Sequence, residues 1–128
     1  MLRQILVVDD STLIQQMYQV FLSRYRGVQL VTADDGAAAL DALAREPEID
    51  LILLDINMPV MNGIEFLERL QREPAYKDIP VIVITTAGRG ADARRCIDLG
   101  ASGHLEKPFQ TPALYTLIEE ITGEKPAP

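Results

Sequence analysis

The stretch Asp50-Leu51-Ile52-Leu53-Leu54-Asp55-Ile56-Asn57-Met58-Pro59 decides the fold of this chain. Its four consecutive apolar residues, 51–54, are too few for a helix and predict a strand buried on both faces, as in the middle of a parallel sheet. The strand ends abruptly in the carboxylate of Asp55. In an open α/β sheet, the residue just past the carboxyl end of a central strand faces the crevice where ligands bind. The stretch therefore predicts an α/β fold and a candidate site at Asp55.

Further strands and helices alternate along the chain. Short apolar runs predict strands at 5–8, 28–32, 81–84 and 104–105. Helical patterns are expected between 11 and 26, at 37–45, between 64 and 73, at 91–99 and at 112–122. This alternation predicts a five-stranded parallel sheet with right-handed crossovers and five helices. The first, third and fourth strands are the most apolar and belong in the interior, which favours the flavodoxin-like, doubly wound order 2-1-3-4-5.

The first and fourth expected helices differ in how many large apolar residues they offer to the core. The first is capped by Ser11 or Asp10, and its expected buried stripe consists of Leu13, Ile14, Met17, Val20 and Phe21. The fourth carries few large apolar residues, chiefly Ile97 and Leu99. Its arginines, Arg89, Arg94 and Arg95, form either a solvated face or a partner-binding surface.

Length, charge and composition exclude several classes of protein. The 128 residues fit one domain, expected at 1–122 with a flexible tail at 123–128, and the net charge of −7 argues against a nucleic-acid-binding surface. The single cysteine, Cys96, excludes an internal disulfide and is expected to be a half-buried, small apolar residue on a helix. No apolar run approaches the roughly 20 residues that span a bilayer, and no signal-peptide pattern opens the chain, so we expect a cytoplasmic protein.

The predicted topology gathers polar residues at one edge of the sheet. Asp9 and Asp10 end the first strand, Asp55 the third, Thr85 the fourth and Lys107 the fifth. Three neighbouring carboxylates repel each other unless a cation neutralises them, and hard oxygen ligands without His or Cys suit Mg²⁺, or alternatively Mn²⁺. The backbone carbonyl of Asn57 and a phosphoryl oxygen would complete the metal shell. Thr85 can donate a hydrogen bond to a phosphoryl oxygen, Lys107 supplies a positive charge, and Asp55 can accept a phosphoryl group.

Several fragments carry a resemblance to a known family that covers about residues 4–121. They are residues 7–11 (VVDDS), 54–59 (LDINMP), 61–63 (MNG), 84–85 (IT) and 107–109 (KPF). In this order and spacing the chain resembles the receiver domain of bacterial two-component response regulators, and is most similar to free-standing chemotaxis response regulators. The 125–128 tail also resembles the start of a linker, so the chain is expected to be either free-standing or excised from a longer regulator.

The resemblance implies a role for each site residue. Asp55 would be phosphorylated by the phosphohistidine of a sensor histidine kinase or phosphotransfer protein. Asp9, Asp10, Asp55 and the Asn57 carbonyl would hold Mg²⁺, with one acid acting through water. Thr85 would move toward the phosphoryl group, and Lys107 would pair with that group. The peptide bond between Lys107 and Pro108 would be cis. The signal would leave through a face made by the fourth helix, fifth strand and fifth helix to a downstream protein, from a monomer or a weak phosphorylation-dependent dimer.

Two positions depart from the family pattern, because His104 stands where an aromatic switch residue is usual and Thr86 where a small alanine is frequent. Imidazole is smaller and ionises near neutral pH, so coupling from Thr85 could be weaker or pH-sensitive. A β-branched Thr86 could narrow access to the phosphoryl group. The resulting prediction is a switch rather than a turnover enzyme. The alternatives are a non-phosphorylated pseudo-receiver, a metal-dependent phosphohydrolase, disfavoured by Asn57 in place of a second acid, and a flavin or dinucleotide binder, disfavoured by the missing Gly-rich loop.

Overall fold

The computed structural model describes residues 2–57, 62–86, 88 and 90–128. The sequence-motif positions Met58, Pro59 and Met61, together with Arg89, lie outside these described residues. Strands and helices alternate as β1 (Gln4–Val8), α1 (Thr12–Leu22), β2 (Gln29–Ala33), α2 (Gly36–Arg45), β3 (Ile49–Asp55), α3 (Gly63–Arg72), β4 (Val81–Thr86), α4 (Gly90–Asp98), β5 (Gly103–Lys107) and α5 (Thr111–Thr122). The expected elements are all present.

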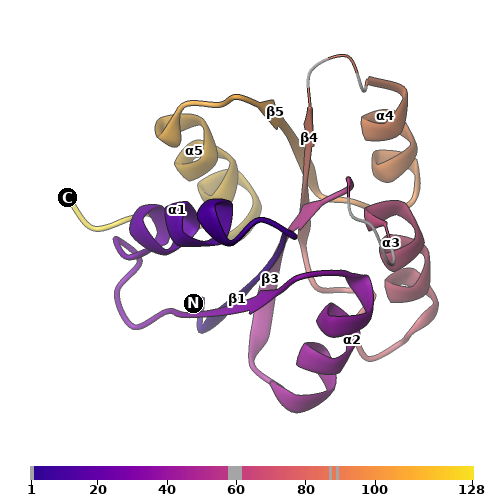
Figure 1. Cartoon of the computed structure of the whole chain (residues 1–128). Coiled ribbons are helices and arrows are strands. Elements are labelled where there is room, and N and C mark those ends of the chain that lie inside the picture. Colours follow the sequence, from indigo (N-terminus) through magenta and orange to yellow (C-terminus); the bar gives the residue numbers. More distant parts are fainter. Residues whose placement is uncertain (1, 58–61, 87, 89) are drawn as a thin grey trace.

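The strands form one parallel sheet in the order β2-β1-β3-β4-β5. Helices α1 and α5 cover one face, and α2, α3 and α4 cover the other (Figure 1). The flavodoxin-like prediction is therefore confirmed. Because the order reverses direction between β1 and β3, the carboxyl ends of these two strands border the crevice that such sheets use for ligands.

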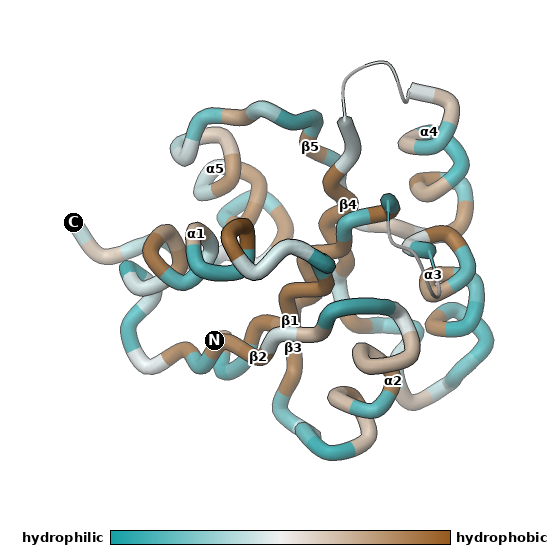
Figure 2. The backbone as a smooth tube through the Cα atoms, viewed as in Figure 1, coloured by the Kyte–Doolittle hydropathy of each residue, from teal (hydrophilic) through white to brown (hydrophobic). Residues whose placement is uncertain are grey.

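Each face of the sheet has its own apolar core. Leu54 and Val83 pack with α2, α3 and α4, whereas Leu53, Ile82 and Ile84 pack with α1 and α5. The two cores exist because side chains of a strand alternate between faces. Hydropathy rises toward the central strands and falls on the outer turns of the helices (Figure 2). Burial of β3 on both sides explains its unbroken apolar run, which places Asp55 at the end of a rigid element.

The buried face of α1 differs from the expected stripe. Tyr18 and Leu22 are buried, while Leu13 is 67% and Val20 is 69% exposed and Met17 is also exposed. Ile14 and Phe21 of the expected stripe are half-buried and pack against the same core as Tyr18 and Leu22, so this part of the expectation holds. Leu13, Met17 and Val20 form a neighbouring stripe at spacings of three and four residues, which makes an apolar surface on the outside of α1.

Helix α4 is anchored by small side chains rather than by the large ones expected. Ala93 and Cys96 are its buried residues, while Ile97 is 42% exposed and Leu99 is half-buried beyond the end of the helix. Arg94 and Arg95 are exposed and pair with Asp98 and Glu68 respectively. The prediction of a lightly anchored helix with an arginine-bearing outer face is thus supported for these two residues.

The ends of the chain lie near each other. The backbone N–H of Leu2 donates to the Glu124 carboxylate at 3.2 Å, and the N–H of Ala127 donates to the Arg24 carbonyl at 2.7 Å. Flexibility of residues 123–128 stays a prediction. Among the described helices, none combines the length and apolar character needed to cross a membrane.

Candidate functional site

Three acids converge at the carboxyl edge of the sheet. Asp9 and Asp10 follow β1, and Asp55 ends β3. One carboxylate oxygen of each lies within 4.8 Å of the others. Asp9 and Asp55 are buried and Asp10 is exposed, so the cluster opens to solvent on one side. This convergence follows from the topology, since β1 and β3 are neighbours in register.

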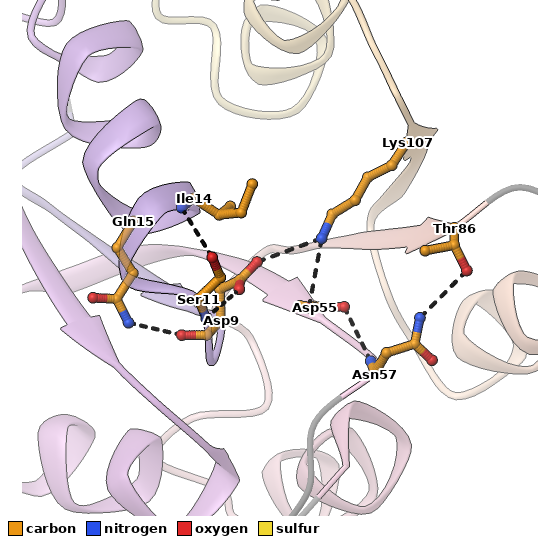
Figure 3. Close-up of polar contacts among 8 residues, drawn as sticks. All are labelled: Asp9, Ser11, Ile14, Gln15, Asp55, Asn57, Thr86 and Lys107. Atoms are coloured by element: carbon orange, nitrogen blue, oxygen red, sulfur yellow. Dashed lines mark hydrogen bonds and ion pairs between the residues drawn. The ribbon is translucent and has the colours of Figure 1, made fainter.

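Lys107 reaches into this cluster from the far edge of the sheet. Its Nζ lies 3.5 Å from Asp9 Oδ2 and 3.6 Å from Asp55 Oδ2 (Figure 3). The ammonium thus bridges two buried carboxylates while its side chain remains 25% exposed. The peptide from Lys107 to Pro108 is cis, as the resemblance implied.

Local hydrogen bonds fix the direction of the Asp9 and Asp55 carboxylates. The backbone N–H of Ser11 donates to Asp9 Oδ1 at 2.9 Å, and the N–H of Asn57 donates to Asp55 Oδ1 at 3.0 Å. The Gln15 amide donates to the Asp9 carbonyl at 2.7 Å and to Asp34 at 2.8 Å. Sequence patterns gave no signal for Gln15. The second oxygens of Asp9 and Asp55 are left to face Lys107 and the opening of the site (Figure 3).

Ser11 and Asn62 organise the helices beside the site. The Ser11 hydroxyl accepts from the Ile14 N–H at 3.3 Å and caps α1, which decides between the two caps that the sequence allowed. Asn62 caps α3, and the next residue, Gly63, donates its N–H to the Ile56 carbonyl. A Cβ on Gly63 would lie 2.5 Å from the Ile56 Cα, so only glycine permits this close packing beneath the Asp55 loop.

Burial and the neighbouring groups of Asp55 act on the pKa of its carboxyl in opposing directions. Burial raises the pKa of its carboxyl, and the nearby Asp9 and Asp10 raise it further. The Asn57 N–H and the Lys107 ammonium lower the pKa but do not cancel the effect of burial. An ionised Asp55 is therefore a desolvated carboxylate, which is less stabilised than one in water and correspondingly more reactive toward an electrophile.

The acid cluster fits a hard divalent cation. Asp9 Oδ2 is buried and accepts no hydrogen bond, although Lys107 lies nearby. Mg²⁺ binds oxygens at about 2.0–2.1 Å and keeps several waters. Oxygens up to 4.8 Å apart suit a site in which one of the three acids reaches the ion through water. Asp9, Asp10 and Asp55 thus have the chemistry for Mg²⁺, with the Asn57 carbonyl as a further candidate ligand.

Thr85 does not join the acid cluster through any described contact. Its side chain is buried, and its hydroxyl lies 2.7 Å from His104 Nε2. Thr86 is exposed and accepts a long, 3.5 Å hydrogen bond from the Asn57 amide, which links the ends of β3 and β4 (Figure 3). The role of Thr85 toward a phosphoryl group stays a prediction. The importance of His104 was predicted, whereas its direct bond to Thr85 was not.

Cys96 is set apart from this chemistry. It is fully buried among apolar residues of the α2–α4 core, and burial raises the pKa of its thiol to about 11. A thiol in this state is a packing residue rather than a nucleophile or ligand. The expected apolar role on a helix is confirmed, but Cys96 is fully buried rather than half-buried.

This fold and this acid edge define a signalling receiver. Residues 5–119 match the family described as the response regulator receiver domain, and the chain belongs to that family. It is 31% identical to a chemotaxis protein CheY homolog of Campylobacter jejuni over 94% of this chain and 92% of that protein. It is 39% identical to the phosphate regulon transcriptional regulatory protein PhoB of Escherichia coli, over 94% of this chain but 52% of that protein. The chemotaxis protein CheY4 of Vibrio cholerae has a TM-score of 0.84 at 33% identity, covering 94% of this chain and 99% of its own.

Proposed function

We propose that this receiver domain is a phosphorylation-controlled switch whose phosphoacceptor is Asp55. The observation that supports this most strongly is the placement of Asp55 between the other acids and Lys107. Asp55 is 6% exposed and ends a central strand, and its carboxylate has one oxygen held by Asn57 and the other 3.6 Å from Lys107. A nucleophile held in this way has little freedom left to lose when it meets an electrophile.

The transfer reaction follows from these positions. An Asp55 oxygen attacks the phosphorus of a donor phosphohistidine while the phosphorus–nitrogen bond breaks, and the released imidazole nitrogen keeps the electron pair and takes up a proton. The product is an acyl phosphate on Asp55. Lys107 neutralises charge on the phosphoryl oxygens, and a bound Mg²⁺, held by Asp9, Asp10 and Asp55, would supply further neutralisation. Water attack on the same phosphorus breaks the phosphorus–oxygen bond to Asp55, releases inorganic phosphate and restores the carboxylate. The domain thus resets itself and is no turnover enzyme on a separate substrate.

The phosphodonor is expected to dock beside the site on the exposed face of α1. Leu13, Met17 and Val20 form an apolar surface there. Leu13 follows Asp9 in the sequence by about one helical turn, and the other two residues lie farther along α1. Next to it, a cavity of about 200 Å³ between α1 and β5 is lined by Met17, Tyr18 and Lys107 among others. An apolar surface continuous with the reactive edge fits a sensor histidine kinase or a phosphotransfer protein that presents a histidine from an apolar helix face.

The output is expected at a second face, made by α4, β5 and α5. Helix α4 has small buried contacts and exposed Arg94 and Arg95, so its position is weakly fixed and its outer face can select an acidic partner. The downstream target is a protein, reached by a monomer or by a weak dimer formed on phosphorylation. We place this activity in the cytoplasm, where histidine kinases present their phosphodonor domains.

Phosphorylation by a small donor tests this function directly. The chain is incubated with acetyl phosphate and Mg²⁺ and its intact mass is measured, with Asp55→Asn as the matched variant. Wild type should gain the mass of one phosphoryl group only when Mg²⁺ is present, and Asp55→Asn should gain none. Absence of the adduct in wild type would move the assignment to a pseudo-receiver that binds partners without phosphorylation.

A further inference from the structure

The buried Thr85 hydroxyl and the half-buried His104 imidazole form a polar pair on the side of the sheet away from Asp55. Asp55 is paired with Ile84, whose side chain packs against α1 and α5. Side chains alternate along a strand, so Thr85 shares the opposite face with Val83, which packs against α2, α3 and α4. The cross-strand partner of Val83 is His104, which places the imidazole diagonally beside Thr85.

The contact within this pair is short and shielded. Thr85 Oγ1 and His104 Nε2 are 2.7 Å apart, and Thr85 is 1% exposed. A hydroxyl has a single proton to donate, and a buried hydroxyl that loses its partner keeps the full cost of its desolvation. Thr85 therefore has a reason to stay turned toward His104 for as long as the other face of the sheet offers it nothing better.

We propose that His104 is a positioning residue that holds the Thr85 hydroxyl on the α3/α4 side of the sheet until Asp55 is modified. This inference rests on the proposed function, because the competing partner is a phosphoryl oxygen on Asp55. Movement of Thr85 Oγ1 toward that oxygen takes it away from Nε2, so the hydrogen bond breaks whichever of the two atoms donates. The Thr85–His104 hydrogen bond therefore stabilises the unmodified state relative to the activated state, in which this bond is lost.

The ease with which the domain is activated then depends on the strength of one hydrogen bond. Removing the imidazole nitrogen leaves Thr85 free to turn, so activation should become easier rather than harder. A side chain that only fills space beside β4 would have the opposite effect or none, since its loss weakens packing in both states. The sign of the effect therefore separates a latch from a structural role.

A double-mutant cycle measures this sign. Beryllofluoride with Mg²⁺ serves as the phosphoryl mimic, and its affinity is measured for wild type, His104→Phe, Thr85→Val and the double variant. His104→Phe should bind beryllofluoride about twofold to tenfold more tightly than wild type, the range of one net hydrogen bond. In the Thr85→Val background the same change should leave the affinity unaltered. Equal or weaker binding by His104→Phe, or an undiminished effect without the Thr85 hydroxyl, would overturn the proposal.

An imidazole signature tests the latch without relying on variants of His104. His104 is the single histidine of the chain, so its ring ¹⁵N resonances need no assignment by mutation. Beryllofluoride should shift the Nε2 resonance of wild type in the direction that Thr85→Val shifts it in the free protein, since both remove the same hydrogen bond. If the protein binds beryllofluoride but its Nε2 resonance does not shift, the proposed role of His104 is contradicted, whereas the proposed function is not. Failure of wild type to bind beryllofluoride or to react with acetyl phosphate instead overturns the proposed function, and the latch with it.

Discussion

Replacing Lys107 with methionine removes one ammonium from between two buried carboxylates and keeps a side chain of similar length. At 3.5 and 3.6 Å, and with the effective dielectric constant of about 20 found near protein surfaces, each attraction is about 4–5 kcal/mol before solvation is counted. The ammonium loses hydration at the site, where the Lys107 side chain is only 25% exposed, and this loss offsets much of the attraction. Between the values for exposed and fully buried pairs, we expect Lys107→Met to lower the free energy of unfolding by about 2 kcal/mol at neutral pH.

Urea unfolding without Mg²⁺ measures this change at neutral and acidic pH. Lys107 lowers the pKa of Asp55 although burial keeps that pKa above its ordinary value, so the attraction between them exists only while Asp55 is ionised and should fade as the pH falls through the raised pKa of Asp55. The matched control is Lys125→Met, since Lys125 is 73% exposed and pairs with Glu119 at 3.8 Å. It should cost less than about 1 kcal/mol at either pH. Equal losses for both lysines, or a Lys107 effect that persists in acid, would refute the electrostatic reasoning.

Three further outcomes are expected. Because the pKa of Asp55 is raised on folding, its charge opposes folding above the carboxyl range, so Asp55→Asn should stabilise the chain by on the order of 1 kcal/mol at pH 7 and not in acid, as urea unfolding would show. Mg²⁺ at a hundredfold excess over its Kd should stabilise wild type by about 2.7 kcal/mol in thermal unfolding, and Asp9→Asn should remove most of this gain. Val20→Asp should slow phosphotransfer from a histidine kinase about tenfold but leave acetyl phosphate reactivity intact, whereas the equivalent change at exposed Ile97, Ile97→Asp, should alter neither.

Much of the fold could be predicted because the sequence of β3 indicates that this strand is buried on both faces. An apolar run with no polar face must be covered on both sides, and the alternation of strands and helices then leaves few topologies. The buried face of α1 could not be predicted. Leu13, Met17 and Val20 compete with Tyr18 and Leu22 for the core at similar spacing, and only packing against the finished sheet decides between the two stripes.

The acid edge was predictable for the same topological reason, since Asp9, Asp55 and Lys107 end strands that must finish at one edge. The orientation of Thr85 depends instead on the register of β4 against β3, which the sequence alone does not specify. A shift by a single residue exchanges the two faces of a strand. The bond to His104 is a consequence of that register, which places Thr85 and His104 together on the face away from Asp55.

The location of the phosphoryl group tests the central claim most directly. After reaction with acetyl phosphate and Mg²⁺, hydride reduction converts an aspartyl phosphate to homoserine, and peptide mass mapping then finds the altered position. We predict homoserine at Asp55 and at no other acid, including the neighbouring Asp9 and Asp10. Homoserine at either neighbour, or unaltered aspartate throughout, would contradict the assignment of Asp55 as the phosphoacceptor.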